Sequence, residues 1–211
     1  MVSTRDLLII LKRISARIEE NKQWLTDLDR PIGDSDHGIN MARGFGEVEK
    51  KLPGLEGKDA GTVLKTVGMT LVSTVGGSAG PLYGSAFMKA GMALGDKTEI
   101  SMADFLEACD QAVLAVKQRG KSDAGEKTML DAMIPALQTM KEAEKQGEAP
   151  KIILKKGVEA SWAGVEATKE LIATKGRASY VGERGIGCQD PGATSFSILL
   201  EAVLNWMEDR V

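Results

Sequence analysis

Apolar residues recur three or four positions apart along most of this chain, a spacing typical of helices that bury one face. The clearest case puts four apolar residues on one face: Phe105, Cys109, Ala112 and Val116. Ser101 and Asp104 form a capping-box pattern before this segment, and Gly120 is a typical helix end. No segment shows the alternation of a convincing strand. The sequence therefore predicts an all-α protein.

The same pattern predicts the other helices. We expect them over residues 4–25, 41–52, 63–71, 78–94, 128–145 and 158–172, and over a last segment after Pro191 and Gly192. Pro135 should kink the helix that contains it. Short connections favour antiparallel neighbours, so about eight helices should form an up-and-down bundle or barrel. We expect a single domain over residues 1–211.

Composition excludes several classes of partner. The net charge of −3 and the lack of a basic run argue against nucleic acid. No apolar run approaches the roughly 20 residues of a membrane span, and the first residues lack a signal-peptide core. The two cysteines make no disulfide framework, which suits a reducing compartment. We therefore expect a cytoplasmic protein that binds neither membranes nor nucleic acid.

Residues 28–40 concentrate oxygen ligands in what should be a loop. Asp29, Asp34 and Asp36 lie there beside His37, the only histidine of the chain. Pro31 prevents a continuous helix, so the carboxylates can converge. Mg²⁺ prefers carboxylate oxygens and is often held together with phosphate groups. The segment predicts a magnesium site.

A calcium loop or a simple helix cap would account for less of this segment. A calcium loop that started at Asp34 would need glycine and glutamate where Ile39 and Phe45 stand, which excludes an EF-hand. Asp34 and Asp36 could instead cap the next helix, but capping uses one carboxylate and leaves the others without a role.

Residues 73–84 form a glycine-rich turn that should open a helix. Such a turn can bring backbone N–H groups and the Ser78 hydroxyl close to phosphate. Equally, its small residues could only allow two helices to pack closely. The P-loop is excluded: Gly120, Lys121 and Ser122 match its end, but Ala115 stands where it needs glycine.

Two further polar loops complete the pattern. Residues 119–131 are mostly small and charged and contain Thr128, a residue type that favours an N-cap. Residues 175–194 are long for an idle connection, and Arg177 or Arg184 could bind a phosphoryl group through two hydrogen bonds. In an up-and-down fold these four loops are the odd-numbered ones. They should meet at one rim and form a phosphate and metal site.

These motifs resemble a known family, the nucleotide-binding L subunit of bacterial dihydroxyacetone kinases that depend on the phosphoenolpyruvate phosphotransferase system. The matching stretches are residues 33–38, 68–81, 127–129, 176–180 and 189–194. The likeness extends over essentially the whole chain. Glu126 stands where an aspartate is expected, and Cys188 where another polar residue such as histidine can stand.

The resemblance implies an eight-helix antiparallel barrel that holds ADP, or ATP, as a bound coenzyme at its rim. Two Mg²⁺ ions would be held by Asp29, Asp34 and Asp36, and Arg177 would act in catalysis. The implied nucleotide contacts are His37, Gly38, Ile39, Asn40, Ser78, Ala79, Gly120, Thr128, Met129, Arg177, Asp190, Pro191 and Gly192. We interpret His37 as a nucleotide contact rather than a phosphate carrier, because neighbouring carboxylates disfavour a phosphohistidine.

The resemblance also implies partners. A phosphohistidine carrier (M) subunit would phosphorylate the bound ADP, and a K subunit would hold the dihydroxyacetone that receives the γ-phosphoryl group. A transcription regulator and a second copy in a homodimer are further candidate partners. Two alternative functions stay open: the nucleotide domain of an ATP-dependent dihydroxyacetone kinase, and a nucleotide-binding interaction module.

Overall fold

The computed structural model describes residues 1–210. Within them, nine α-helices carry the fold: α1 (Thr4–Glu20), α2 (Lys22–Asp29), α3 (His37–Lys51), α4 (Ala60–Thr74), α5 (Ala79–Leu94), α6 (Met102–Gly120), α7 (Leu130–Lys145), α8 (Pro150–Ala167) and α9 (Pro191–Glu208). Four short 3₁₀ helices are η1 (Leu52–Leu55), η2 (Thr168–Glu170), η3 (Arg177–Tyr180) and η4 (Gly182–Gly185). The predicted all-α class is confirmed.

Two features of the fold were not predicted: a break in the first helix and a short pair of strands. The first predicted helix is divided at Asn21, whose side-chain amide donates to the carbonyl of Arg17 (2.8 Å) and so competes with helix continuation. This break accounts for nine helices instead of eight. Strands β1 (Val2–Ser3) and β2 (Glu99–Ile100), which the sequence did not predict, pair antiparallel with Val2 opposite Ile100.

Local capping decides where several helices begin. The expected capping box of Ser101 and Asp104 is present at the start of α6. The helix expected from Thr128 begins only at Leu130, because Thr128 belongs to the preceding turn and uses its hydroxyl to accept from the N–H of Leu130. The prediction that Ile172 shares a helix face is wrong, because α8 already ends at Ala167.

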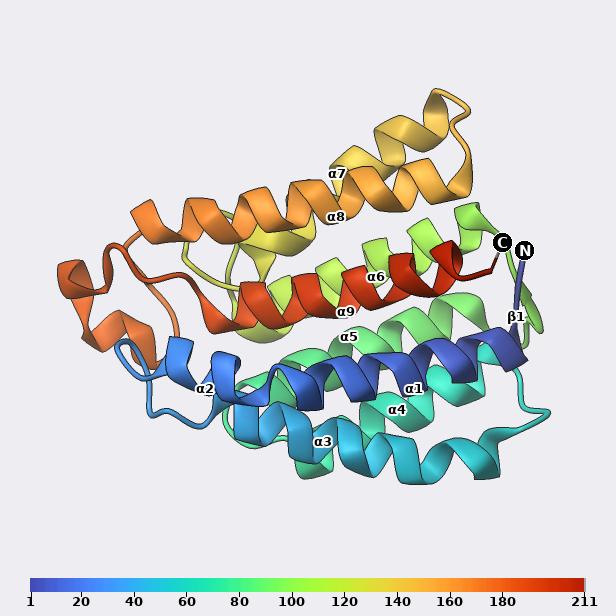
Figure 1. The fold of residues 1–211 in the computed structure, drawn as a ribbon, viewed down its shortest axis with the longest axis horizontal. Helices are drawn as coiled ribbons and strands as arrows, with labels where there is room; N and C mark the ends of the chain where they lie inside the picture. The colour runs from blue at the N-terminus through green and yellow to red at the C-terminus, as the bar shows by residue number, and fades with distance from the viewer. Residues whose placement is uncertain (211) are drawn as a thin grey trace.

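The helices form a closed ring of antiparallel neighbours (Figure 1). Contacts run from α3 through α4, α5, α6, α7 and α8 to α9, and α1 packs against both α9 and α3 to close the ring. Helices α3, α5, α7 and α9 all begin at the end opposite the two termini, on the left in Figure 1. We call this end the rim.

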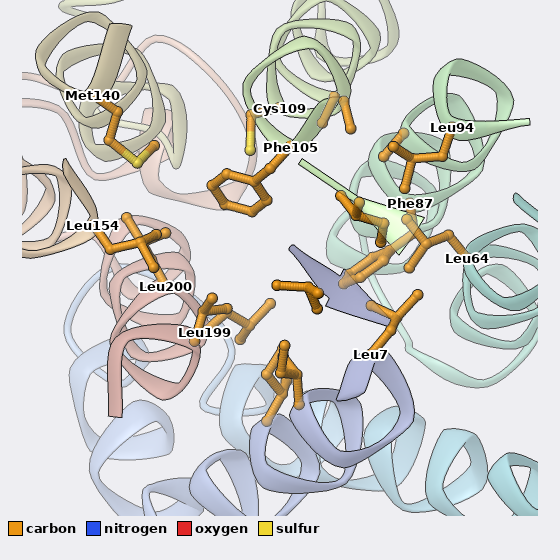
Figure 2. A pocket seen from close by; sticks show the side chains of 18 of the residues that line it. Leu7, Leu64, Phe87, Leu94, Phe105, Cys109, Met140, Leu154, Leu199 and Leu200 are labelled. Atoms are coloured by element: carbon orange, nitrogen blue, oxygen red, sulfur yellow. The ribbon is translucent and has the colours of Figure 1, made fainter. Parts of the chain in front are cut away.

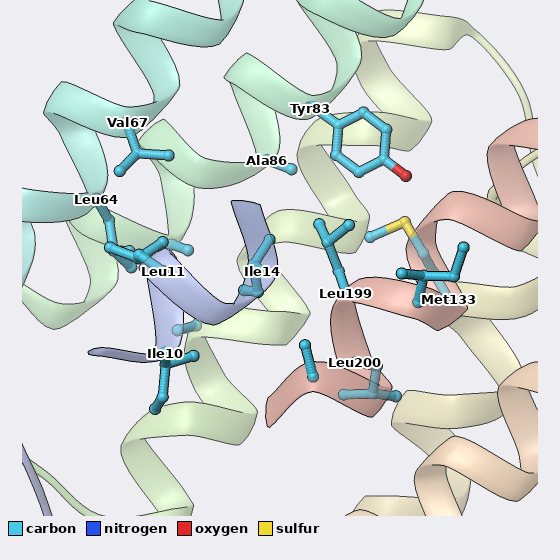
Figure 3. Close-up of a cluster of buried hydrophobic side chains, with 14 of the residues drawn as sticks. Ile10, Leu11, Ile14, Leu64, Val67, Tyr83, Ala86, Met133, Leu199 and Leu200 are labelled. Atoms are coloured by element: carbon cyan, nitrogen blue, oxygen red, sulfur yellow. The ribbon is translucent and has the colours of Figure 1, made fainter. Parts of the chain in front are cut away.

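The inside of the ring is apolar. A continuous core extends from Ile10 on α1 to Trp206 on α9, and Figure 3 shows part of it around Leu11 and Leu199. It surrounds a cavity of about 380 Å³, whose lining includes Phe87, Phe105 and Leu199 (Figure 2). Tyr83 also lines this cavity. Among residues 1–210, no helix combines the length and apolar character needed to cross a membrane.

Candidate functional site

The three aspartates of the acidic segment are brought together at the rim. Asp29 is the last residue of α2, and Asp34 and Asp36 lie in the loop before α3; one carboxylate oxygen of each lies within 4.8 Å of the others. Asp29 Oδ2 accepts from the backbone N–H groups of Asp36 (3.0 Å) and His37 (3.2 Å). Asp29 therefore fixes the loop and the start of α3 while belonging to the cluster.

Only one cation pairs directly with this cluster in the described part of the chain. Arg177, the first residue of η3, places its Nε 2.8 Å from Asp34 Oδ2. The Arg177 side chain is 70% exposed, so water screens this pair and weakens it. Three close carboxylates with a single, exposed cation fit a divalent ion that prefers oxygen ligands. The donor set thus suits Mg²⁺.

His37 is held by side chains of two other helices. Its Nε2 lies 3.0 Å from Ser195 Oγ on α9, and that oxygen lies 2.7 Å from the hydroxyl of Tyr83 on α5. Burial lowers the pKa of His37, although the charges of Asp29 and Asp36 and a backbone hydrogen bond with Pro191, the first residue of α9, oppose this. The imidazole is therefore a neutral group beside the acidic cluster.

The glycine-rich turn lies against the first turn of α3. A Cβ on Gly76 would be 2.8 Å from the Asn40 side chain, so this close approach requires glycine. Arg43 donates to Asn40 Oδ1 (2.7 Å) and to the carbonyl of Thr74 (2.8 Å). These contacts join the start of α3 to the turn that opens α5 at Ser78.

Helix α5 differs from the other helices that begin at the rim. Carboxylates bind N–H groups at the other three starts: Asp29 at α3, Asp131 before α7 and Asp190 at α9. The start of α5 has no side-chain cap at Ser78 and no acidic residue in its first turn. Within residues 1–210 it is the one rim start whose positive helix end is not matched by a carboxylate.

Lys127 joins the remaining two loops. Its side chain is 2% exposed, and its ammonium donates to the carbonyls of Thr168 (2.6 Å), Gly185 (3.0 Å) and Cys188 (2.5 Å). Burial lowers the pKa of Lys127, while the charge of Asp190 is the largest influence in the other direction. The α6–α7 loop is thereby fastened to the α8–α9 segment.

Asp190 is a buried carboxylate with a shifted titration. Its Oδ2 accepts from the N–H of Ala193 (2.7 Å) and caps α9. Burial is the main cause that raises the pKa of Asp190 to about 7, and the charge of Asp131 adds to it. The N-cap hydrogen bond and Lys127 oppose the rise.

The structure places every predicted site residue at the rim, though not every side chain faces outward. Gly38 is packed against α2, where a Cβ would lie 2.0 Å from the carbonyl of Lys22. Asn40 and Met129 are buried, and Ile39 is exposed. The other predicted contacts begin or precede helices: His37, Ser78, Ala79, Thr128, Asp190, Pro191 and Gly192, with Gly120 at the end of α6.

Sequence reasoning missed three side chains that organise this region. Tyr83 and Ser195 occupy core-facing helix positions, and Lys127 belonged to a matching motif but received no role. Neither helical spacing nor loop composition reveals which distant residues a buried hydroxyl or ammonium contacts. The only available signal was a lysine directly before Thr128 and Met129, and the other charged residues of that loop conceal it.

Comparisons with known proteins agree with this geometry. A family model described as the DAK2 domain matches residues 31–205. The ADP-binding subunit DhaL of PEP-dependent dihydroxyacetone kinase 1 from Listeria innocua is 44% identical over 194 residues, 92% of each chain. The ADP-binding subunit DhaL of the PTS-dependent dihydroxyacetone kinase from Lactococcus lactis is 45% identical, covering 92% of this chain and 93% of that one.

A solved structure shows the same fold. The dihydroxyacetone kinase from C. freundii, in complex with AMP-PNP and Mg²⁺, superposes with a TM-score of 0.72 at 25% sequence identity. The match covers 94% of this chain and 33% of that one, so this chain spans about a third of the length of that kinase.

Proposed function

Because this chain belongs to the DAK2 domain family, among the ADP-binding L subunits of phosphoenolpyruvate-dependent dihydroxyacetone kinases, we propose that it is the nucleotide-holding subunit of such a phosphotransferase. One observation carries the proposal: three carboxylates converge within 4.8 Å beside the helix starts of the rim. Residues 1–211 would act as one domain, which the continuous core supports.

The acidic cluster is the proposed metal site. Asp29, Asp34 and Asp36 would hold Mg²⁺, and two ions fit the charge of three carboxylates together with a diphosphate. Within residues 1–210, no side chain other than Arg177 forms an ion pair with these carboxylates, which supports this assignment.

The start of α5 is the proposed phosphate site. No carboxylate accepts a hydrogen bond from the backbone N–H groups at Ser78 and Ala79, and such free N–H groups at a helix start favour an anion. The further contacts proposed for ADP or ATP are His37, Gly38, Ile39, Asn40, Gly120, Thr128, Met129, Arg177, Asp190, Pro191 and Gly192. All of them lie at the rim.

Arg177 is the proposed catalytic residue. Its exposed side chain can turn from Asp34 to the transferring phosphoryl group and neutralise charge that develops there. When bound, ADP would take a phosphoryl group from a phosphohistidine and pass it, as the γ-phosphoryl group of ATP, to dihydroxyacetone. No nucleophile from this chain is required, because positioning and charge neutralisation dominate phosphoryl transfer.

The proposal requires partner subunits. A phosphohistidine carrier M subunit would supply the phosphoryl group, and a K subunit would present dihydroxyacetone to the rim. A transcription regulator and a second copy of the chain are further proposed partners. We also propose that the protein is located in the cytoplasm, the compartment in which such a carrier operates.

Mass spectrometry of the native protein in magnesium buffer tests the nucleotide assignment. We expect retained ADP and Mg²⁺, and release of both after EDTA. Asp34→Asn should weaken retention, whereas Asp27→Asn on α2 should not, because Asp27 only pairs with Arg30 and Gln23 on its own surface. A wild-type protein that ignores adenine nucleotides in magnesium buffer would refute the proposal.

Activity assays test the partner requirement. Dihydroxyacetone phosphorylation should appear only when carrier and K subunits are added together. Rapid exchange of a labelled bound nucleotide, with activity driven by ATP alone, would favour an ATP-dependent kinase. Capture of a regulator without any kinase activity would favour the interaction module.

A further inference from the structure

Below the rim, three polar side chains from three helices form a hydrogen-bonded chain. His37 begins α3, Ser195 lies in α9 and Tyr83 lies in α5. Ser195 is fully buried and Tyr83 is 2% exposed. In Figure 3 the Tyr83 hydroxyl is directed toward the α9 ribbon, while its ring borders the apolar core. The chain therefore runs from the core to the base of the candidate site.

The donors and acceptors in this chain can be counted. Tyr83 has one O–H, and its nearest acceptor is Ser195 Oγ at 2.7 Å; the carbonyl of Gly192 is farther, at 3.4 Å. Burial and the nearby charge of Asp190 raise the pKa of Tyr83, so it stays a phenol. Tyr83 thus donates to Ser195.

Ser195 then has one proton and two acceptors, His37 Nε2 and the carbonyl of Gly192, each at 3.0 Å. The Gly192 carbonyl precedes Ser195 within α9 and already lies within the hydrogen-bond ladder of that helix. The imidazole nitrogen is the more basic acceptor. A hydroxyl that accepts from a phenol is also a stronger donor, because hydrogen bonds in a chain polarise one another.

We propose that Tyr83 and Ser195 are positioning residues of the nucleotide site, which direct a hydroxyl onto Nε2 of His37 and hold the ring proton on Nδ1. The partner of one ring nitrogen sets which nitrogen carries the proton. A fixed ring also steadies the first turn of α3, whose N–H groups bind Asp29 of the acidic cluster. The functional part of this inference rests on the proposed nucleotide contact of His37.

The single histidine makes the tautomer directly measurable. In nitrogen-15 NMR of the nucleotide-free protein, Nε2 is the nitrogen coupled to both carbon-bound ring protons. At pH 8 we expect it to have the shift of an unprotonated nitrogen in the wild type. Ser195→Ala should move that shift toward a protonated nitrogen, and Tyr83→Phe should move it in the same direction by less.

Ser197→Ala is the matched control. Ser197 is also fully buried on α9, but its hydroxyl has no hydrogen-bond partner in the described structure. This variant should leave the His37 tautomer unchanged and should not lower stability. A wild-type Nε2 that carries the proton, or a tautomer unchanged in Ser195→Ala, would overturn the inference.

Calorimetric titration with ADP in magnesium buffer tests the consequence for binding. Ser195→Ala and Tyr83→Phe should each weaken ADP binding about tenfold, the size typical for losing a partner that orients a binding side chain. Ser197→Ala should bind like the wild type. Unchanged affinity in both network variants would overturn the positioning role. If the wild type fails to bind ADP, the proposed function fails, while the NMR result still decides whether the network sets the tautomer.

Discussion

Replacing Lys127 by methionine should test how the rim loops are held together. The side chains of lysine and methionine are similar in length. Lys127 has a left-handed backbone conformation, with φ of +57°. Neither side chain relieves that strain, so Lys127→Met removes the ammonium and changes little else. The carbonyls of Thr168, Gly185 and Cys188 then lose the ammonium as a donor. The Thr168 and Gly185 carbonyls keep a backbone donor, the N–H of Leu171 and of Cys188 respectively.

The size of the effect follows from these contacts. Three hydrogen bonds from a charged donor would contribute about 1.5 to 3 kcal/mol each if they were independent. The cost of burying the ammonium, seen in its lowered pKa, offsets much of that sum. We expect a net loss of about 2 to 4 kcal/mol, because the Cys188 carbonyl is left without a donor and the other two carbonyls lose a charged one. That is a large fraction of the roughly 5 to 15 kcal/mol that stabilises a typical domain.

Urea unfolding followed by circular dichroism measures this loss as a lower midpoint at an unchanged slope. Lys121→Met is the matched control. Lys121 also has a left-handed backbone, with φ of +48°, but its side chain is exposed and makes no hydrogen bond or ion pair within residues 1–210. The control should change the unfolding free energy by less than about 0.5 kcal/mol. If Lys127→Met were no more destabilised than Lys121→Met, the ammonium would not hold the loops together.

The other predictions concern titration, packing and capping. Asp190 has a pKa of about 7 in the folded protein against an ordinary value of 3.8, so the folded state binds more protons between these values and loses stability as pH rises through them. A pKa difference of about three corresponds to about 4 kcal/mol, so Asp190→Asn should raise the unfolding free energy at pH 8 by up to that amount, with little gain near pH 4; an equal effect at both pH values would contradict this. Gly164→Ala should cost about 2 to 3 kcal/mol, because a Cβ would lie 2.1 Å from the carbonyl of Asp131. Gly46→Ala, where a Cβ meets nothing within 4 Å, should stabilise α3 by about 0.5 to 1 kcal/mol in the same unfolding assay. Ser101→Ala should cost about 1 kcal/mol by removing the cap of α6, and an unchanged midpoint would show that the cap is dispensable.

Helices were predictable wherever local interactions decide them. The capping box of Ser101 and Asp104 depends on residues three apart, so the sequence contains the whole signal. The break at Asn21 was not predictable, because an isolated asparagine is tolerated in many helices and its effect depends on the next turn. Thr128 fits an N-cap by residue type, yet the surrounding loop delays the helix to Leu130.

The acidic cluster was predictable for a similar reason. Asp34 and Asp36 are two residues apart, and the loop is so short that both carboxylates stay close to Asp29. The chain of His37, Ser195 and Tyr83 was not predictable, since its members are separated by 158 and 112 residues. Periodicity assigns such residues to a buried face but does not show which of them meet.

The charges at the rim explain why metal and nucleotide should bind together. Helices both begin and end there, so their dipoles largely cancel, and side chains decide the local sign. Arg43 and Lys127 donate to carbonyls at the ends of α4 and α8. Their positive charges therefore serve contacts inside the protein instead of neutralising the acidic cluster. The acidic cluster would repel a diphosphate without added cations, whereas the start of α5 attracts one. The loop before α3 and the loop before α5 are therefore complementary, since the acidic cluster would hold the metal ion that neutralises a diphosphate bound at the start of α5. The odd-numbered connections of an up-and-down ring place both at the same end.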